Sequence, residues 1–167
     1  TPWTTYHEIL SKPMADIVGA KPSEVVIMNT LSTNLHLMMV SFYRPTAKRH
    51  KILIESDAFP SDSYAVKSQI KEKGYYPDES LILWKPRPGE DLCRFEDLEA
   101  LMKKHGEEIA LVMIGNSNYY TGQKYPIKEI TQLGHQYGCK VGFDLAHGVG
   151  NIDADLHDNG PDFAVWC

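Results

Sequence analysis

Residues 126–144 read PIKEITQLGHQYGCKVGFD, and this stretch decides the class of fold. Pro126 stands at the start of a helical segment and Gly138 follows its end, so we expect a helix over residues 126–137. The apolar segment 140–144 comes almost at once and predicts a buried strand. A helix that leads directly into a buried strand is the repeating unit of an α/β fold.

The same alternation continues on both sides of this stretch. Nearly continuous apolar runs predict further strands at residues 25–28, 51–55, 80–84, 109–114 and 163–166. Helices are expected at residues 6–18, 33–42, 62–73 and 95–105, with Pro13 breaking or kinking the first. Strands of this apolar character occur in parallel sheets that are covered on both faces. We therefore predict a three-layer αβα domain with a mainly parallel sheet.

Composition bounds the class of protein. The 167 residues are 43% hydrophobic and 23% charged, which suits one sizeable core and a single domain. The net charge of −5 argues against nucleic acid as a partner. No apolar run approaches the roughly 20 residues of a membrane span, and Cys93, Cys139 and Cys167 lack metal-binding spacing. We expect a cytoplasmic protein with reduced thiols, no membrane segment, no metal site and no disulfide.

The end of the chain has an unusual pattern. The last six residues, Asp-Phe-Ala-Val-Trp-Cys, form an apolar strand-like run with no turn residue or polar cap after it. A natural terminus rarely ends inside a buried strand, because unpaired backbone groups there need partners. We expect the chain to be part of a longer protein.

Segments that follow predicted strands are the first candidates for a binding site. In open α/β sheets, ligands bind beyond the carboxyl ends of the strands. Four such segments carry polar or aromatic residues: residues 29–34, 57–62, 115–123 and 144–147. We expect them to face one crevice.

Asp144 ends an apolar strand, where an ionised carboxylate is costly unless a cation lies opposite it. The protonated ring nitrogen of a cofactor would serve, and His147 is close enough in sequence to reach the same ligand. The alternative is that Asp144 caps the next segment and His147 is an ordinary loop residue.

The segment 31–34 is rich in hydroxyl groups and leads into a helix, which suits a phosphate site at Ser32 and Thr33 or a routine helix cap. The sequence lacks GxxxxGK[ST] and GxGxxG, so neither a nucleoside triphosphate nor a Rossmann dinucleotide is indicated. Phe59 is either a core residue or a stacking platform for a planar ligand. Asp62 either caps its helix or belongs to the site.

Four segments stand in an order and at separations that match one family. They are Asn29-Thr-Leu-Ser-Thr-Asn-Leu-His-Leu37, Lys51-Ile-Leu-Ile-Glu55 with Ala58-Phe-Pro-Ser-Asp-Ser-Tyr64, Tyr119-Tyr-Thr-Gly-Gln123 and Gly142-Phe-Asp-Leu-Ala-His-Gly-Val-Gly-Asn151. Together they resemble the kynureninase family, pyridoxal-phosphate enzymes of the class V aminotransferase group. Pro2-Trp3 is similar to the substrate-side segment of that family. The resemblance covers essentially the whole chain.

This resemblance implies a fold type I pyridoxal-phosphate enzyme, with residues 1–167 as the central part of its cofactor-binding large domain. It implies that Leu31 and Ser32 hold the cofactor phosphate and that Phe59 stacks on the pyridine ring. By the same resemblance, Asp144 pairs with the pyridinium nitrogen, and His147 approaches the cofactor beside it. Further cofactor contacts are implied at Pro60, Ser61, Asp62 and Gly115. At Gly115 relatives tend to carry a small hydroxyl residue.

The implied reaction is the hydrolysis of L-kynurenine or 3-hydroxykynurenine to anthranilate or 3-hydroxyanthranilate plus L-alanine, a step of tryptophan catabolism. The family's Schiff-base lysine is expected a few residues beyond Cys167, so no catalytic residue is assigned and the chain by itself is expected to be inactive. A homodimer is also implied. The alternatives are a cysteine desulfurase-like or epimerase-like class V enzyme, or a non-catalytic α/β module. Phe59 argues against a desulfurase, which more usually stacks a histidine there.

Overall fold

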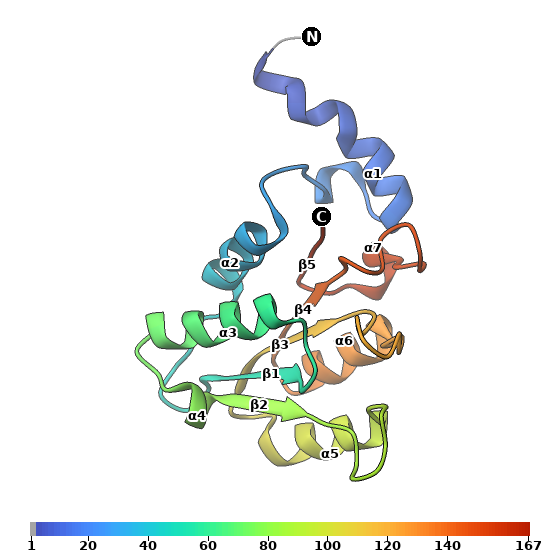
Figure 1. The fold of residues 1–167 in the computed structure, drawn as a ribbon. Helices are drawn as coiled ribbons and strands as arrows, with labels where there is room; N and C mark the ends of the chain where they lie inside the picture. Colours follow the sequence, from blue (N-terminus) through green and yellow to red (C-terminus); the bar gives the residue numbers. More distant parts are fainter. Residues whose placement is uncertain (1–2) are drawn as a thin grey trace.

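The computed structural model describes residues 3–167, and its centre is a five-stranded sheet (Figure 1). The strands lie in the order β2-β1-β3-β4-β5 and all four neighbouring pairs are parallel. Their bounds are β1 (Lys51–Glu55), β2 (Leu81–Trp84), β3 (Ile109–Gly115), β4 (Lys140–Asp144) and β5 (Phe163–Val165). The predicted parallel sheet is therefore confirmed.

Helices cover both faces of the sheet. Successive residues of a strand point to opposite faces, so Ile52 and Ile54 join one core and Leu53 joins the other. The first core packs under α2 (Leu31–Phe42) and α3 (Pro60–Glu72). The second packs under α5 (Phe95–His105) and α6 (Ile127–Gln136). Figure 1 shows the resulting three layers, as the apolar strands predicted.

The N-terminal segment projects from this body (Figure 1). It consists of the 3₁₀ helix η1 (Trp3–Leu10) and the helix α1 (Ser11–Val18). The 3₁₀ helix gives way to the α-helix at Ser11. Pro13 does not break α1, because it lies in the first turn, where no intrahelical bond needs its missing N–H. Trp3 is exposed, and Pro2 of the Pro2-Trp3 motif lies outside the described residues.

One predicted strand is wrong. Residues 25–28 form no strand, and Val25 instead packs beside Ala15 and Val18 of α1 in a small separate core. Three short helices went unpredicted: η2 (Pro22–Glu24), α4 (Pro77–Ser80) and α7 (Leu156–Asn159).

Two helices begin two residues earlier than predicted. α2 begins at Leu31, with Thr30 as its N-cap, and α3 begins at Pro60, with Phe59 as its N-cap. Proline suits the first position of α3 because its fixed φ matches the helix.

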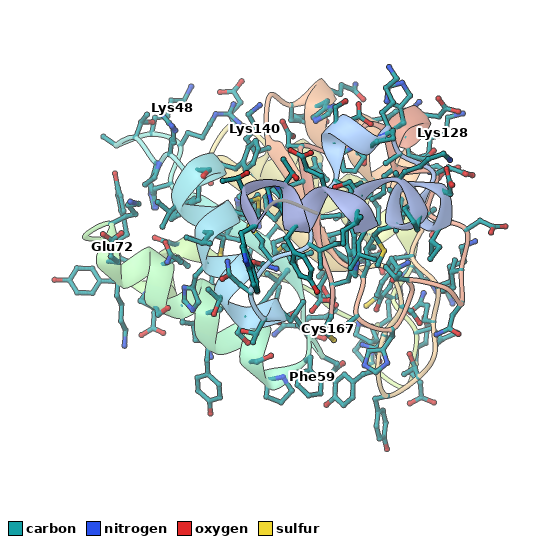
Figure 2. All side chains as sticks on the ribbon, turned by 90° about the horizontal axis from the view of Figure 1, so that it is seen from above. Lys48, Phe59, Glu72, Lys128, Lys140 and Cys167 are labelled. Atoms are coloured by element: carbon teal, nitrogen blue, oxygen red, sulfur yellow. The ribbon has the colours of Figure 1, made fainter. Side chains whose placement is uncertain are left out.

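The amino and carboxyl ends of the strands lie on opposite sides of the molecule. In Figure 2, Lys48 and Lys140 lie on one side of the molecule and Phe59 and Cys167 on the other. Phe59 follows the carboxyl end of β1, and Lys140 begins β4. Among residues 3–167, no helix is long and apolar enough to cross a membrane.

Candidate functional site

A small cavity lies at the carboxyl edge of the sheet. Its enclosed part measures about 20 Å³, room for about one water molecule or the edge of a ring. Eight residues line it: Glu55, Phe59, Asp62, Gly115, Ser117, Tyr119, Asp144 and His147. Three of the four predicted segments meet here, so most of the expected crevice forms.

Asp144 sits at the end of β4, in register with Gly115 of β3 and Val165 of β5. It is 8% exposed, and its Oδ1 accepts a hydrogen bond from the backbone N–H of Ala146 at 2.7 Å. The capping interpretation therefore accounts for one carboxylate oxygen. It does not account for the position of this carboxyl in the cavity wall beside two other acidic groups.

Asp62 is the second acidic group. It is the third residue of α3 rather than its cap, and it is 7% exposed. Ser61 Oγ donates to its Oδ1 at 3.3 Å. Burial, a hydrogen-bonding contact with Asp144 and the charges of Asp144 and Glu55 raise the pKa of Asp62 to about 8. Asp62 therefore retains a proton near neutral pH, beside the carboxyl of Asp144.

Glu55 is the third acidic group, and the sequence analysis missed it. It ends β1 and is 4% exposed. Its Oε1 accepts the backbone N–H of Gly115 at 3.2 Å, and its buried Oε2 has no hydrogen-bond partner. Burial, more than the nearby Asp144 and Asp57, raises the pKa of Glu55 to about 7. A carboxylate at the end of the apolar run Lys51–Glu55 was the available signal, the same one that identified Asp144.

No cation balances these three carboxyls within the described chain. Among residues 3–167 none of the ion pairs involves Glu55, Asp62 or Asp144. Nor do these residues contain a group of three or more His, Cys, Asp or Glu arranged to hold a metal ion. A cavity with this surplus of acidic groups either retains protons or binds a cationic ligand.

Aromatic rings form the other wall. Phe59 is 47% exposed, so it is not a core residue, and its ring packs edge-to-face with Tyr119 at a centroid distance of 5.1 Å and an angle of 83°. Such pairs hold each other in a defined orientation. His147 is exposed at the mouth of the cavity. Tyr119, which belongs to the predicted segment 115–123, also lines the cavity, although the sequence analysis gave it no role there.

Two buried asparagines lie in the loop after β3, and the side chain of Asn118 holds the loop in place. Asn118 Oδ1 accepts the backbone N–H groups of Tyr120 and Thr121, and its Nδ2 donates to the Asp57 carbonyl at 3.0 Å. Both side-chain polar atoms of Asn116 are buried without a hydrogen-bond partner, directly against Gly148. Any Cβ at residue 148 would overlap the Asn116 amide.

Gly115 has a steric role. A Cβ at this position would lie 3.1 Å from Glu55 Oε1, inside ordinary contact distance. The glycine therefore lets the Glu55 carboxyl reach the backbone N–H of residue 115. This is a physical reason for glycine where the resembling family tends to carry a hydroxyl residue.

Four predicted site residues do not line the cavity: Leu31, Ser32, Pro60 and Ser61. Pro60 and Ser61 open α3 between the cavity residues Phe59 and Asp62. Leu31 and Ser32 form the first turn of α2.

The first turn of α2 lies at the same edge of the sheet as the cavity. At the far end of α2, Tyr43 Oη donates to the carbonyl of His50, just before β1, so the helix starts at the carboxyl edge. The exposed Ser32 hydroxyl and the unpaired N–H groups of this turn remain a candidate phosphate site.

Comparison with solved structures shows what this arrangement resembles. The apo structure of a cysteine desulfurase from Thermococcus onnurineus NA1 superposes with a TM-score of 0.79 at 20% identity, over 95% of this chain and 38% of that chain. An alanine–glyoxylate aminotransferase from Nostoc sp. superposes with a TM-score of 0.72 at 14% identity, over 95% and 39%. At these identities the likeness establishes the fold alone, the large-domain architecture of fold type I transferases.

Sequence comparison is more specific. The chain is 58% identical over 166 residues to a kynureninase of Myxococcus xanthus and 50% identical over 166 residues to that of Rattus norvegicus, covering 99% of this chain in each case. It spans 39% and 36% of the lengths of these relatives. It is thus a kynureninase homologue that corresponds to part of the full enzyme. The family model "Aminotransferase class-V" matches residues 3–167, and the chain therefore belongs to the class V aminotransferase family.

Proposed function

We propose that this chain forms the pyridoxal-phosphate-binding part of an enzyme that hydrolyses the Cβ–Cγ bond of L-kynurenine or 3-hydroxykynurenine. The products are L-alanine and anthranilate or 3-hydroxyanthranilate. One observation carries the proposal: Asp144 is a buried acid without a cationic partner, beside the exposed ring of Phe59, in a chain up to 58% identical to kynureninases.

The residues of the cavity fit this cofactor. A pyridinium N–H is a planar cationic donor, which three acidic groups without a salt-bridge partner would accept. Phe59 lies in the wall of the cavity with its ring exposed, so it would offer that ring to the face of the cofactor. The first turn of α2 supplies N–H groups and the Ser32 hydroxyl for a phosphate.

Each residue then has a separate task. When bound, pyridoxal phosphate supplies an electron sink for charge that develops at the Cα of the substrate. Asp144 holds the proton at the ring nitrogen, and Phe59 contacts the ring face and excludes water from it. Ser61 supports Asp62 through its hydroxyl. The lysine that moves the Cα proton is expected beyond Cys167, where the family resemblance places it.

The assembly and location follow the same family pattern. We propose a cytoplasmic homodimer, since fold type I enzymes generally form their sites at a subunit interface. The described cysteines support a reducing compartment, because Cys93, Cys139 and Cys167 are all unpaired.

The test is an activity assay on the product of the complete gene. With pyridoxal phosphate and L-kynurenine, we expect anthranilate, followed by its fluorescence, and an equal amount of alanine. Removing the cofactor should abolish both products, and adding it back should restore them. The same assay with 3-hydroxykynurenine measures substrate preference.

Two outcomes would contradict the proposal. Release of sulfide from cysteine, without cleavage of either kynurenine, would favour a desulfurase. A complete gene product that shows no absorbance of bound cofactor would favour a non-catalytic α/β module.

A further inference from the structure

Glu55 is one of the three acidic groups of this cavity, but the function proposed above gives it no task of its own. Its position is fixed by one hydrogen bond, from the Gly115 N–H to Oε1 at 3.2 Å. Its Oε2 is buried, lacks a partner and belongs to a side chain that lines the cavity. A buried carboxyl oxygen without a donor costs free energy unless it is protonated or a ligand contacts it.

Most of the titratable groups around Glu55 are acids. Asp144 and Asp57 act on it from the ends of β4 and β1, and Asp62 lies across the cavity on α3. His147 lines the same space. Like charges this close cannot all ionise, so the empty cavity retains protons at neutral pH.

Behind the sheet, two neutral groups face Glu55. They are the buried Tyr125 and the buried thiol of Cys93, and Glu55 contributes to raising the pKa of both. Neither group supplies a positive charge. A cation that enters the cavity would therefore favour the ionised form of Glu55.

We propose that Glu55 is a positioning residue for the ring nitrogen of the cofactor. The Glu55 carboxyl carries a proton in the empty cavity and releases it to solvent when a cationic ring nitrogen binds beside Asp144. The O–H bond of the Glu55 carboxyl breaks and its proton passes to solvent as the ring N–H brings in its positive charge; no other covalent bond changes. This inference rests on the assignment of the cavity to pyridoxal phosphate. It adds a third carboxyl to the contact and predicts that cation binding is linked to pH through this residue.

The test uses the complete gene product freed of cofactor, with pyridoxine 5′-phosphate as a probe that has the ring nitrogen and phosphate but no aldehyde. Its dissociation constant is measured by calorimetry from pH 6 to pH 8 for the native protein, for Glu55→Gln and for Asp57→Asn. Glutamine keeps the shape and the acceptor for the Gly115 N–H but cannot release a proton. Asp57 is an exposed neighbouring acid with the smallest of the effects that raise the pKa of Glu55, so its variant is a control for the loss of a nearby charge.

We expect equal affinities for native protein and Glu55→Gln at pH 6, and a native affinity about fivefold higher than that of the variant at pH 8, because one group with a pKa near 7 is linked to binding. Asp57→Asn should follow the native profile. Calorimetry in buffers of different ionisation enthalpy should show that probe binding releases fewer protons from Glu55→Gln than from the native protein. Parallel pH profiles for all three proteins would overturn the inference.

A second readout needs neither cofactor nor activity. The free energy of unfolding of the cofactor-free protein should fall less between pH 5 and pH 8 in Glu55→Gln than in the native protein. Identical slopes would contradict a proton on Glu55. If kynurenine is not cleaved but the linked proton is observed, the enzymatic proposal fails while the role of Glu55 in cation binding stands.

Discussion

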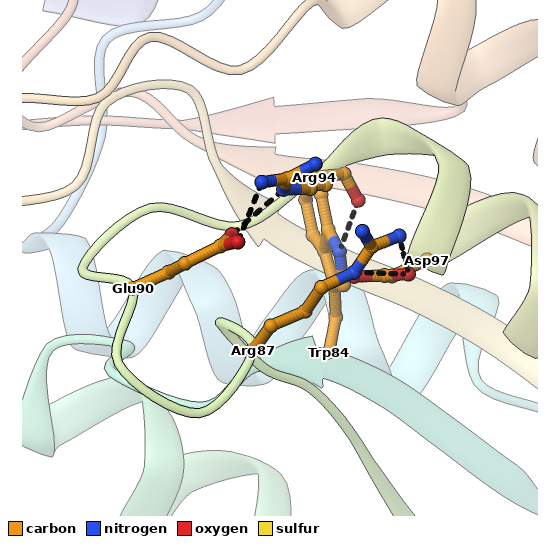
Figure 3. A network of polar contacts seen from close by, with 5 residues as sticks. All are labelled: Trp84, Arg87, Glu90, Arg94 and Asp97. Carbon is orange, nitrogen blue, oxygen red and sulfur yellow. Dashed lines mark hydrogen bonds and ion pairs between the residues drawn. The ribbon is translucent and has the colours of Figure 1, made fainter.

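Two acidic regions lie beyond the carboxyl ends of neighbouring strands and are built in opposite ways. After β2, the exposed acids are paired: Arg87 binds Asp97 through two bonds of 2.8 Å, and Arg94 binds Glu90 (Figure 3). Trp84 Nε1 ties the loop to the sheet by donating to the Arg94 carbonyl at 2.9 Å. In the cavity beyond β1 and β4, three buried acids have no arginine or lysine at all.

The difference separates acids that are paired within the fold from acids that the proposed function assigns to a ligand. The hydrogen bond and charge of Arg87 lower the pKa of Asp97, whereas burial raises the pKa of Glu55 to about 7. The exposed ion pairs cost little to form and contribute little to the free energy of unfolding. The buried acids destabilise the empty protein and would gain most from a cation. Proteins accept such a local cost mainly at functional sites.

The largest effect is expected for Asp144→Ala in the complete enzyme. Removing the acid that holds the ring proton should lower turnover of kynurenine about 10³-fold, in the range found when one preorganised electrostatic contact is lost. The measurement is the rate of anthranilate formation at saturating cofactor, with Asp153→Ala, an exposed acid outside the cavity, as the control. Turnover within tenfold of the native rate would remove Asp144 from the proposed ring contact.

Asp144 also illustrates what could be predicted from the sequence. A carboxylate at the end of an apolar strand was a local signal, and it located the cavity correctly. Glu55 carried the same signal at the end of β1, but its importance depends on two other acids that only the fold brings near.

The start of α3 and the segment 25–28 show why other parts could not be predicted. Because the helix begins at Pro60, Asp62 is its third residue and turns into the cavity instead of capping. The β-branched run 25–28 suits a strand locally, yet it packs on α1 rather than on the sheet. Both outcomes are decided by tertiary packing.

The next effect in size is a pH dependence with opposite signs in the two regions. Glu55 and Asp62 bind more protons in the folded state, so the free energy of unfolding should fall as pH rises from about 5 to 8, by about 3 kcal/mol from Glu55 alone. Asp97 acts in reverse, because its stabilising contribution is lost as pH falls below about 4.

Urea unfolding of the cofactor-free protein at successive pH values measures both arms of this dependence. Maximum stability is expected near pH 5, which is set by the two pKa shifts of opposite sign. Asp62→Asn should flatten the arm above pH 5 and leave the arm below it unchanged. A stability that rises steadily to pH 8 would show that the cavity acids are not protonated in the folded state.

A smaller effect is expected where a partly buried acid does have partners. Asp162, just before β5, accepts hydrogen bonds from Lys140 at 2.6 Å, from His135 at 2.8 Å and from the Val141 N–H at 2.8 Å. Although burial acts in the other direction, these partners lower its pKa. Asp162→Ala should reduce the free energy of unfolding by about 2 kcal/mol, since it leaves a backbone donor unpaired.

The measurement is chemical denaturation at pH 7, with Asp153→Ala again as the exposed control, expected to change stability by less than about 0.5 kcal/mol. The experiment compares Asp162, an acid with partners, with the acids of the cavity. Removing a partnered acid should destabilise the protein, while neutralising an unpartnered one, as in Glu55→Gln, should stabilise it at pH 8. If both substitutions destabilise the protein, the cavity acids also stabilise the fold.

The smallest effect is expected at the exposed pair Arg87–Asp97. Arg87→Ala removes three charge-assisted hydrogen bonds, but both side chains are partly solvated, so the free energy of unfolding should fall less than in Asp162→Ala. Raising the salt concentration should shrink the difference further, because exposed charges are screened. Lys85→Ala, an exposed neighbour without an ion pair, is the control. A salt-independent loss as large as that of Asp162→Ala would mean that this loop, like the cavity, depends on buried charge. The two regions would then differ only in the presence of arginine.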